Sequence, residues 1–158
     1  MTKSKKSFDN IVIRAAQATD IVELTSLIEA HAKFEKQSID VLGLGERLAF
    51  AMQGDEPRLT VYVAQLNSAL VAYCALVVEY SSWRAQNFVH MDCLYVNSTS
   101  RGVGVGAALF ERAISFTKAS GLSDIEWQSP SWNTRAQKFY ESQGASYDLK
   151  TRYRLAVG

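Results

Sequence analysis

The chain has 158 residues, 47% of them hydrophobic and 11% aromatic, which is typical of one compact domain. Its 17 Lys and Arg residues nearly balance its 16 Asp and Glu residues, and the net charge of +1 argues against a nucleic-acid binder or a polybasic membrane-surface protein. With 21% charged residues, 2 prolines and 9 glycines, the composition excludes a disordered or low-complexity chain. We expect a single domain over residues 1–158, with residues 1–9 as a flexible tail.

The cysteines and histidines bear on metal and redox chemistry. Cys74 and Cys93 lie in apolar runs outside any C-x-x-C pair, and His31 and His90 add no credible ligand spacing. No apolar run reaches the ~20 residues that cross a bilayer, and no apolar segment follows the basic start of the chain. We therefore predict reduced thiols, no metal, and a cytoplasmic protein with neither nucleic-acid nor membrane partners.

Hydrophobic spacing predicts the elements of the first half of the chain. Asp20 precedes apolar residues at helical spacing and is a candidate N-cap, and Asn67-Ser68 separates two alternating runs that form a hairpin. The predicted elements are a strand at 11–14, a helix from 21 to about 36, a helix at 46–52, and strands at 59–65 and 69–79.

The second half alternates strands with helices. The predicted elements are a strand at 88–96, a helix from 104 to about 120, a strand at 125–127, a helix at 133–143, and strands at 147–149 and 153–157. Because hairpins come early and alternation comes late, we expect a mixed α/β sheet.

A glycine-rich turn joins the strand at 88–96 to the next helix. It runs Arg101-Gly102-Val103-Gly104-Val105-Gly106-Ala107. Alternate glycines let the backbone approach a ligand, and a helix N-terminus presents unpaired N–H groups and the positive end of the helix dipole. The segment favours a pyrophosphate site, although the same glycines would also serve a tight turn alone.

Two nucleotide-binding interpretations do not fit this context. A Rossmann turn belongs to the first βαβ unit and is followed, about 20 residues on, by an acid at the end of the next strand. Here the glycines begin at residue 102, and Gln128-Ser129 follows the next strand. The turn also lacks the Gly-Lys-Ser/Thr of a P-loop.

The turn resembles instead the pyrophosphate signature of the GNAT N-acetyltransferase family, Arg/Gln-x-x-Gly-x-Gly/Ala, which Arg101, Gly104 and Gly106 match. A second segment, Asn133-Thr-Arg-Ala136-Gln-Lys-Phe139-Tyr140-Glu-Ser-Gln-Gly144-Ala145, resembles the Asn-x-x-Ala-x-x-Phe-Tyr-x-x-x-Gly-Phe/Ala segment of that family. Residues 32–35, 92–96 and 132–133 are similar to the diamine (spermidine/spermine) acetyltransferase branch.

The resemblance implies an α/β fold with a central, mostly antiparallel sheet of six to seven strands flanked by helices. It also implies acetyl-CoA as co-substrate. The backbone of residues 94–96 would pair with the pantetheine arm, and the turn would receive the pyrophosphate. The implied cofactor-binding residues are Leu94, Tyr95, Val96, Arg101, Gly102, Val103, Gly104, Val105, Gly106, Ala107, Asn133 and Ala136.

The family resemblance implies catalytic roles for two residues. Tyr140 matches the family tyrosine that protonates the departing thiolate, which suits a phenol with a reference pKa of about 10. Asp92 matches the position of a glutamate that takes the amine proton through water in the diamine branch. Strand alternation places His90, Asp92, Leu94 and Val96 on one face, so His90 is a rival base.

The expected reaction is direct attack of a primary amine in a ternary complex, with a polyamine or other small amine as acceptor. Candidate substrate-binding residues are Phe34, Glu35, Asp92 and Glu126. Two departures from the diamine branch are Cys93, where an acid is common, and the basic segment 150–154. A protein N-terminus or lysine is the alternative acceptor, and a non-catalytic CoA-binding or sensing module is the alternative of another class. We also expect a homodimer.

Overall fold

The computed structural model describes residues 10–158, so the tail predicted at 1–9 lies outside the described residues. The chain divides into two compact units, Met1–Trp127 and Gln128–Gly158. None of the described helices combines the length and apolar character that crossing a membrane requires. The single domain expected over the whole chain stays a prediction.

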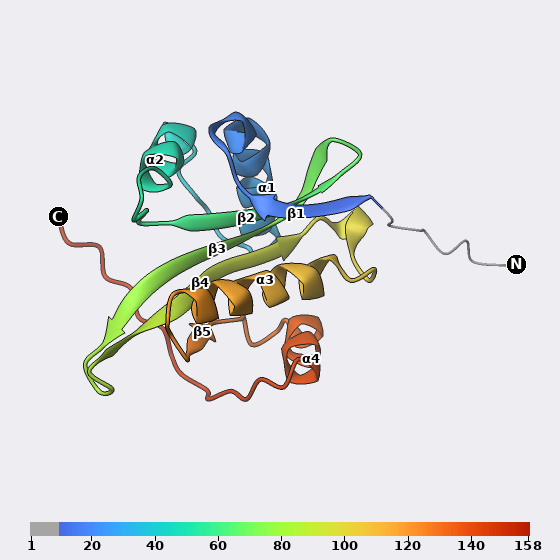
Figure 1. Cartoon of the computed structure of the whole chain (residues 1–158). Coiled ribbons are helices and arrows are strands. Elements are labelled where there is room, and N and C mark those ends of the chain that lie inside the picture. Colours follow the sequence, from blue (N-terminus) through green and yellow to red (C-terminus); the bar gives the residue numbers. More distant parts are fainter. Residues whose placement is uncertain (1–9) are drawn as a thin grey trace, which may run out of the picture. The chain divides into compact units, whose positions relative to one another are not determined.

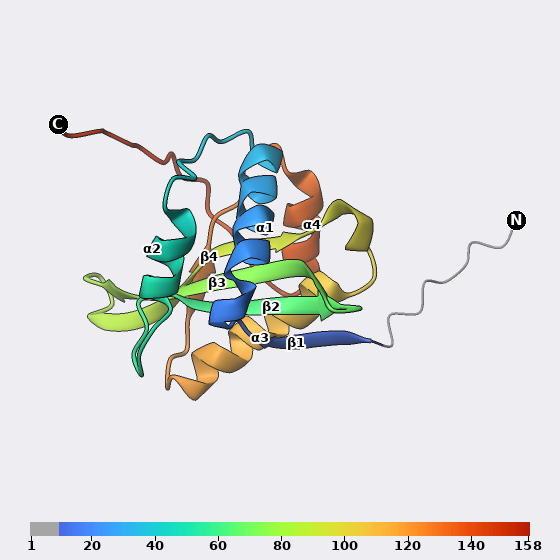
Figure 2. The same ribbon diagram turned by 90° about the horizontal axis from the view of Figure 1, so that it is seen from above.

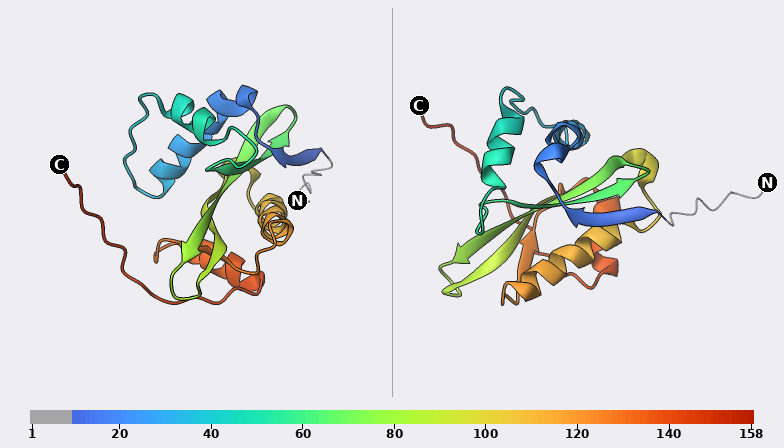
Figure 3. Two further views of the ribbon diagram at one scale, coloured as in Figure 1. Left: turned by 60° about the vertical axis from the view of Figure 1, so that its left-hand side comes forward. Right: turned by 45° about the horizontal axis from the view of Figure 1, so that its top comes forward.

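The first unit is built on a five-stranded sheet in the order β1-β2-β3-β4-β5 (Figure 1). Its strands are β1 (Ile11–Ala15), β2 (Thr60–Leu66), β3 (Ala69–Ser81), β4 (Gln86–Val96) and β5 (Ile125–Trp127). The first four pair antiparallel, and β5 runs parallel to β4. The predicted mixed, mostly antiparallel sheet is confirmed. The long β3–β4 hairpin twists and reaches past β1 and β2 (Figure 3).

The number of strands differs from the prediction of six to seven. In the described residues no strand forms at 147–149 or 153–157, where apolar and polar residues alternate. The large apolar side chains of this segment, Tyr147, Leu149, Tyr153, Leu155 and Val157, are exposed. A segment of alternating apolar and polar residues forms a strand only where a neighbouring strand pairs with its backbone. In the described residues, the segment 147–157 pairs with no strand.

Helices cover both faces of the sheet in the first unit (Figures 1 and 2). The helices α1 (Ile21–Phe34) and α2 (Leu44–Ala51) lie on one face, and α3 (Val105–Ala119) lies on the other. Two short 3-10 helices, η1 (Ala18–Asp20) and η2 (Ser98–Ser100), precede α1 and α3. The second unit contains α4 (Thr134–Ser142).

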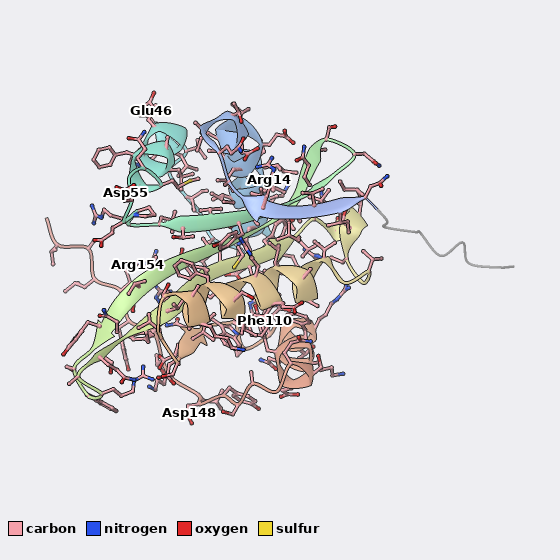
Figure 4. The ribbon with its side chains drawn as sticks, in the orientation of Figure 1. Arg14, Glu46, Asp55, Phe110, Asp148 and Arg154 are labelled. Atoms are coloured by element: carbon pink, nitrogen blue, oxygen red, sulfur yellow. The ribbon has the colours of Figure 1, made fainter. Side chains whose placement is uncertain are left out.

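The start of α1 is held by an ion pair with β1. Both carboxylate oxygens of Asp20 accept hydrogen bonds from Arg14, at 2.6 and 2.8 Å, and the backbone N–H of Gln17 donates to Asp20 at 2.7 Å. Figure 4 shows Arg14 on β1 beside α1. These bonds hold the pKa of Asp20 below its ordinary value. The helix therefore begins after Asp20, as predicted, although the Asp20 side chain caps the 3-10 helix η1 and not α1.

The core between α1 and the sheet positions the site. Leu24 and Leu27 of α1 pack on side chains of β2, β3 and β4 that include Tyr73 and Tyr95. Burial of this apolar area is the main force that fixes α1 on the sheet. It brings the last turn of α1 over Tyr73 of β3 and Tyr95 near the end of β4.

Candidate active site

The candidate base Asp92 lies at a β-bulge. Ala75 and Leu76 are consecutive on β3, yet their partners on β4 are Cys93 and Met91, so Asp92 is an extra residue in the ladder. Its side chain is 57% exposed. The bulge therefore presents a carboxylate to solvent in the middle of a mostly apolar strand.

The same bulge overturns the prediction that His90, Asp92, Leu94 and Val96 share one face. Successive side chains alternate between the two faces of a sheet only while the strand pairing is regular. One extra residue moves every later side chain of the strand to the opposite face. Cross-strand pairing puts His90 on the face of Cys93 and puts Leu94 on the opposite face. Because Nε2 of His90 lies 3.9 Å from Oδ1 of Asp92, the two candidate bases are neighbours.

One side of β4 is open beyond the bulge. The short strand β5 pairs only with residues 89–91 of β4. Within the described part of the chain no strand pairs with residues 92–96 on that side. An open edge offers backbone N–H and C=O groups to an extended ligand. The predicted contact of residues 94–96 with a pantetheine arm fits this edge.

The glycine turn has the geometry of an anion site. Gly102 and Gly104 have φ of +80° and +92°, conformations that favour glycine. A Cβ on Gly104 would meet no other atom within 4 Å, so the space before α3 is open. The amides of residues 105–107 in the first turn have no acceptor within the helix. The turn can thus receive a pyrophosphate group.

Arg101, the first residue of the glycine turn, contacts the end of α1. Its Nε donates to the carbonyl oxygen of Val96 at 2.7 Å. Its guanidinium carbon lies 4.6 Å from the centre of the Phe34 ring and 5.5 Å from that of Tyr95, in cation–π contact. This contact connects the candidate anion site to the end of α1, where Phe34 and Glu35 follow each other.

His31 of α1 is part of the site, although it was not among the site residues predicted from the sequence. Its Nδ1 lies 2.8 Å from Oη of Tyr73, and its Nε2 lies 3.1 Å from Oε1 of Glu35. Its ring stacks on Tyr95, with centres 5.0 Å apart. The spacing of His31 and Glu35, four residues along one helix, was a signal for their contact. No local pattern indicates Tyr73.

Cys93 connects this group to Asp92. It packs against the core cluster that contains Tyr73 and Tyr95, and its thiol donates to Oδ2 of Asp92, with Sγ 3.7 Å away. Burial, with the Asp92 carboxylate, raises the pKa of Cys93 to about 12. Burial also raises the pKa of Tyr73 well above its ordinary value. Both groups therefore keep their protons at neutral pH.

Glu126, the remaining candidate for substrate binding, is engaged by an arginine. Its Oε1 lies 2.6 Å from Nη2 of Arg84, whose Nη1 lies 3.7 Å from Asp124. The structure thus places Phe34 and Glu35 against Tyr95 and His31, Asp92 beside Cys93 and His90 on β4, and Glu126 in a separate ion pair. No group of three His, Cys, Asp or Glu side chains that could hold a metal ion occurs in residues 10–158.

In the second unit, α4 carries the other predicted residues. Asn133 caps the helix, since its Oδ1 accepts from the N–H of Ala136 at 3.2 Å, and its carboxamide N–H₂ is not part of the cap. Tyr140 lies about two turns further along, so it faces the same side of α4 as Asn133. Its ring centre is 5.1 Å from that of Phe139. The helix ends before Gly144, which has φ of +87°.

A mixed sheet with a half-open fourth strand, followed by a glycine turn at a helix N-terminus, defines an acyltransferase that takes its acyl group from coenzyme A. Residues 25–145 match the profile of the Acetyltransferase (GNAT) family, and the chain belongs to that family. It is an N-acetyltransferase, with acetyl-CoA as its co-substrate.

The names of curated relatives indicate the class of acetyl acceptor. The thialysine N-epsilon-acetyltransferase of Bos taurus is 28% identical over 143 residues, which are 85% of this chain and 84% of the relative. The enzyme of the same name from Caenorhabditis elegans is 23% identical over 137 residues, 87% of this chain and 82% of the relative. These similarities support acetylation of an amine.

Solved structures share the fold. A tetramutant of the BH1408 protein from Bacillus halodurans is 30% identical, with a TM-score of 0.71 over 92% of this chain and 99% of that one. The aminoglycoside acetyltransferase meta-AAC0020 from an uncultured soil metagenomic sample has a TM-score of 0.80 at 18% identity, over 96% of this chain and 100% of that one. At 18% identity the likeness shows the fold alone.

Proposed function

We propose that this enzyme acetylates a small primary amine, a polyamine or a lysine-like amine, by direct attack in a ternary complex. The observation that carries the proposal is the exposed Asp92 carboxylate at the bulge, beside the open half of β4. A carboxylate there attracts an ammonium group and accepts its proton. The names of the curated relatives, which specify the side-chain amine of a lysine analogue, support a small acceptor.

Each residue of the site has a task in this reaction. Acetyl-CoA supplies an acetyl group activated as a thioester. The amides of residues 105–107 hold the pyrophosphate, and the Asn133 carboxamide holds the pantetheine arm. Asp92 takes the amine proton through water, which leaves a nitrogen lone pair free to attack. Tyr140 supplies the proton that the leaving sulfur requires.

The acceptor is bound by charge and by aromatic surface. Glu35, at the end of α1, is hydrogen-bonded to His31, which contacts Tyr73 of β3, and its carboxylate is suited to a second ammonium group. Phe34, which is 37% exposed, offers its ring to the apolar part of the substrate. A diamine or a lysine-like amine has two cationic ends with an alkyl chain between them, and it fits Asp92, Glu35 and Phe34.

The proposal is tested with an amine panel. Putrescine, spermidine, lysine, thialysine and a peptide with a free N-terminus are each offered with acetyl-CoA, and free thiol is measured. We expect turnover of the small amines and little turnover of the peptide. Turnover of the peptide alone would identify a protein acetyltransferase. Acetyl-CoA binding without turnover of any amine would identify a non-catalytic module.

Asp92→Asn tests the base. Its rate should fall most near neutral pH, where the amine is charged, and should recover partly in alkali, where the amine is neutral. Asp55→Asn, which removes an exposed acid between α2 and β2, is the matched control and should leave the rate unchanged. If Asp92 instead anchors a second ammonium, the KM of diamines should rise far more than that of monoamines. Indifference to the substitution at every pH would favour His90.

A further inference from the structure

Ser129, in the second unit, has a buried hydroxyl group without a hydrogen-bonding partner. Its Oγ is buried, and within residues 10–158 no group donates a hydrogen bond to it or accepts one from it. We propose that Ser129 binds acetyl-CoA, with its hydroxyl hydrogen-bonded to an amide group of the pantetheine arm. The inference rests on the proposed function, because the contact of Asn133 with the same arm is taken from there.

A buried hydroxyl without a partner destabilises the folded protein. It gives up its hydrogen bonds to water and gains none in return, so most buried polar side chains of native proteins are paired. The buried hydroxyl of Thr117 follows this rule, since it donates to the carbonyl oxygen of Ala113 at 2.9 Å. Where the chain supplies no such partner, a ligand that binds beside the hydroxyl can supply it.

The segment before α4 brings Ser129 close to Asn133. The backbone N–H of Asn133 donates to the carbonyl oxygen of Pro130 at 2.9 Å, which closes a turn over residues 130–133. A turn of this kind brings its first and last Cα atoms within about 7 Å of each other. Nε2 of Gln137 donates to the carbonyl oxygen of Ser131 at 3.0 Å and ties the turn to α4. Ser129 precedes this turn directly, and Asn133 ends it.

The free groups of Ser129 and Asn133 suit an amide ligand. Oδ1 of Asn133 accepts the cap hydrogen bond from Ala136, so its N–H₂ group is the part that can donate to a ligand carbonyl. The hydroxyl of Ser129 can donate one hydrogen bond and accept others. The pantetheine arm carries two amide groups, each with one N–H and one C=O. Both side chains are neutral, which suits these amides better than the charged phosphates of the cofactor.

Ser129→Ala should change stability and binding in opposite directions. Without ligand, the Tm should rise by about 2–4 °C, because the substitution removes a buried polar group that has no partner. The Kd for acetyl-CoA should be about 2- to 12-fold weaker, the factor for one neutral hydrogen bond, measured by isothermal titration calorimetry. A lower Tm would show that the hydroxyl has a partner within the protein and would overturn the proposal, as would an unchanged Kd.

A shorter ligand locates the contact along the cofactor. Adenosine 3′,5′-bisphosphate shares the nucleotide end of acetyl-CoA and lacks the arm. The wild type and Ser129→Ala should bind it with the same Kd, because the lost hydrogen bond belongs to the arm. A loss of affinity as large as that for acetyl-CoA would place the serine at the nucleotide end and overturn the assignment.

Ser131→Ala is the matched control. Ser131 is an exposed serine of the same segment, and its backbone carbonyl, which accepts from Gln137, is kept in the variant. Both its Tm and its Kd for acetyl-CoA should equal those of the wild type. A loss of affinity equal to that of Ser129→Ala would show that the segment as a whole matters and not the buried hydroxyl.

Ser129→Cys provides a second variant of nearly the same size. A thiol forms only weak hydrogen bonds, so this variant should also bind acetyl-CoA more weakly than the wild type. Full affinity in Ser129→Cys would contradict the proposal even if Ser129→Ala did not fold.

The amine panel separates this inference from the proposed function. If the wild type binds acetyl-CoA and acetylates no amine, the proposed function fails, while the Kd ratio between the wild type and Ser129→Ala still decides the contact with the arm. If the wild type acetylates small amines and Ser129→Ala keeps the wild-type Kd, the contact of Ser129 alone fails.

Discussion

Replacing Gly104 by alanine tests the anion site with one methyl group. Gly104 is the N-cap of α3, with φ of +92° and ψ of −4°. An alanine in a left-handed conformation costs about 1–2 kcal/mol. Because the new Cβ meets no protein atom within 4 Å, no steric clash adds to this strain. For a chain of this size, the Tm should fall by roughly 2–8 °C.

The effect on acetyl-CoA binding should be larger than the effect on stability. The methyl group would lie in the open space before the amides of residues 105–107, where phosphate oxygens would approach. Loss of one hydrogen bond to a charged group costs about 1.5–3 kcal/mol. This corresponds to a Kd for acetyl-CoA about 10- to 150-fold weaker, measured by isothermal titration calorimetry.

Gly121→Ala is the matched control for this substitution. Gly121 follows the other end of α3, has φ of +71°, and has equally open space around its Cβ position. Its variant should lose a similar amount of stability and keep the acetyl-CoA affinity of the wild type. Equal affinities in the two variants would refute the reasoning, because the glycines of the turn would then serve the backbone alone.

Three further outcomes are expected. Tyr140→Phe should lower kcat by roughly 10²–10⁴ while the Kd for acetyl-CoA stays nearly the same, and unchanged turnover would make this tyrosine a packing residue. Asp20→Asn should lower the free energy of unfolding in urea by about 2–4 kcal/mol at pH 7, because it removes a buried carboxylate bonded to Arg14. Since the bond with Arg14 holds the pKa of Asp20 below its ordinary value, this stabilisation is present above about pH 4 and is lost as the pH falls through the folded-state pKa. The two proteins should therefore converge in stability in acid, and a constant difference would contradict the assignment. Burial raises the pKa of Cys74 and of Cys93 to about 12, so iodoacetamide should modify both thiols slowly at pH 7.5 in the folded protein and rapidly in urea, and fast alkylation of folded Cys93 would argue against its burial.

Local sequence was sufficient to predict the features that depend on near neighbours in the chain. The start of α1 after Asp20 and the turn before α3 were predicted where the structure has them. Helix caps, glycine conformations and hydrophobic periods are set by residues within a few positions of one another. The family motifs lie in such local segments, so the acetyltransferase assignment was accessible before the fold.

Other features depend on pairing between segments far apart in the chain, and local patterns did not predict them. The bulge at Asp92 exists only relative to β3, and it reversed the predicted face of His90 against Leu94. The contact of His31 with Tyr73 joins residues 42 positions apart and requires α1 to pack on the sheet. The alternation at 147–157 produced no strand, because a strand is stabilised by a partner that the local sequence does not specify.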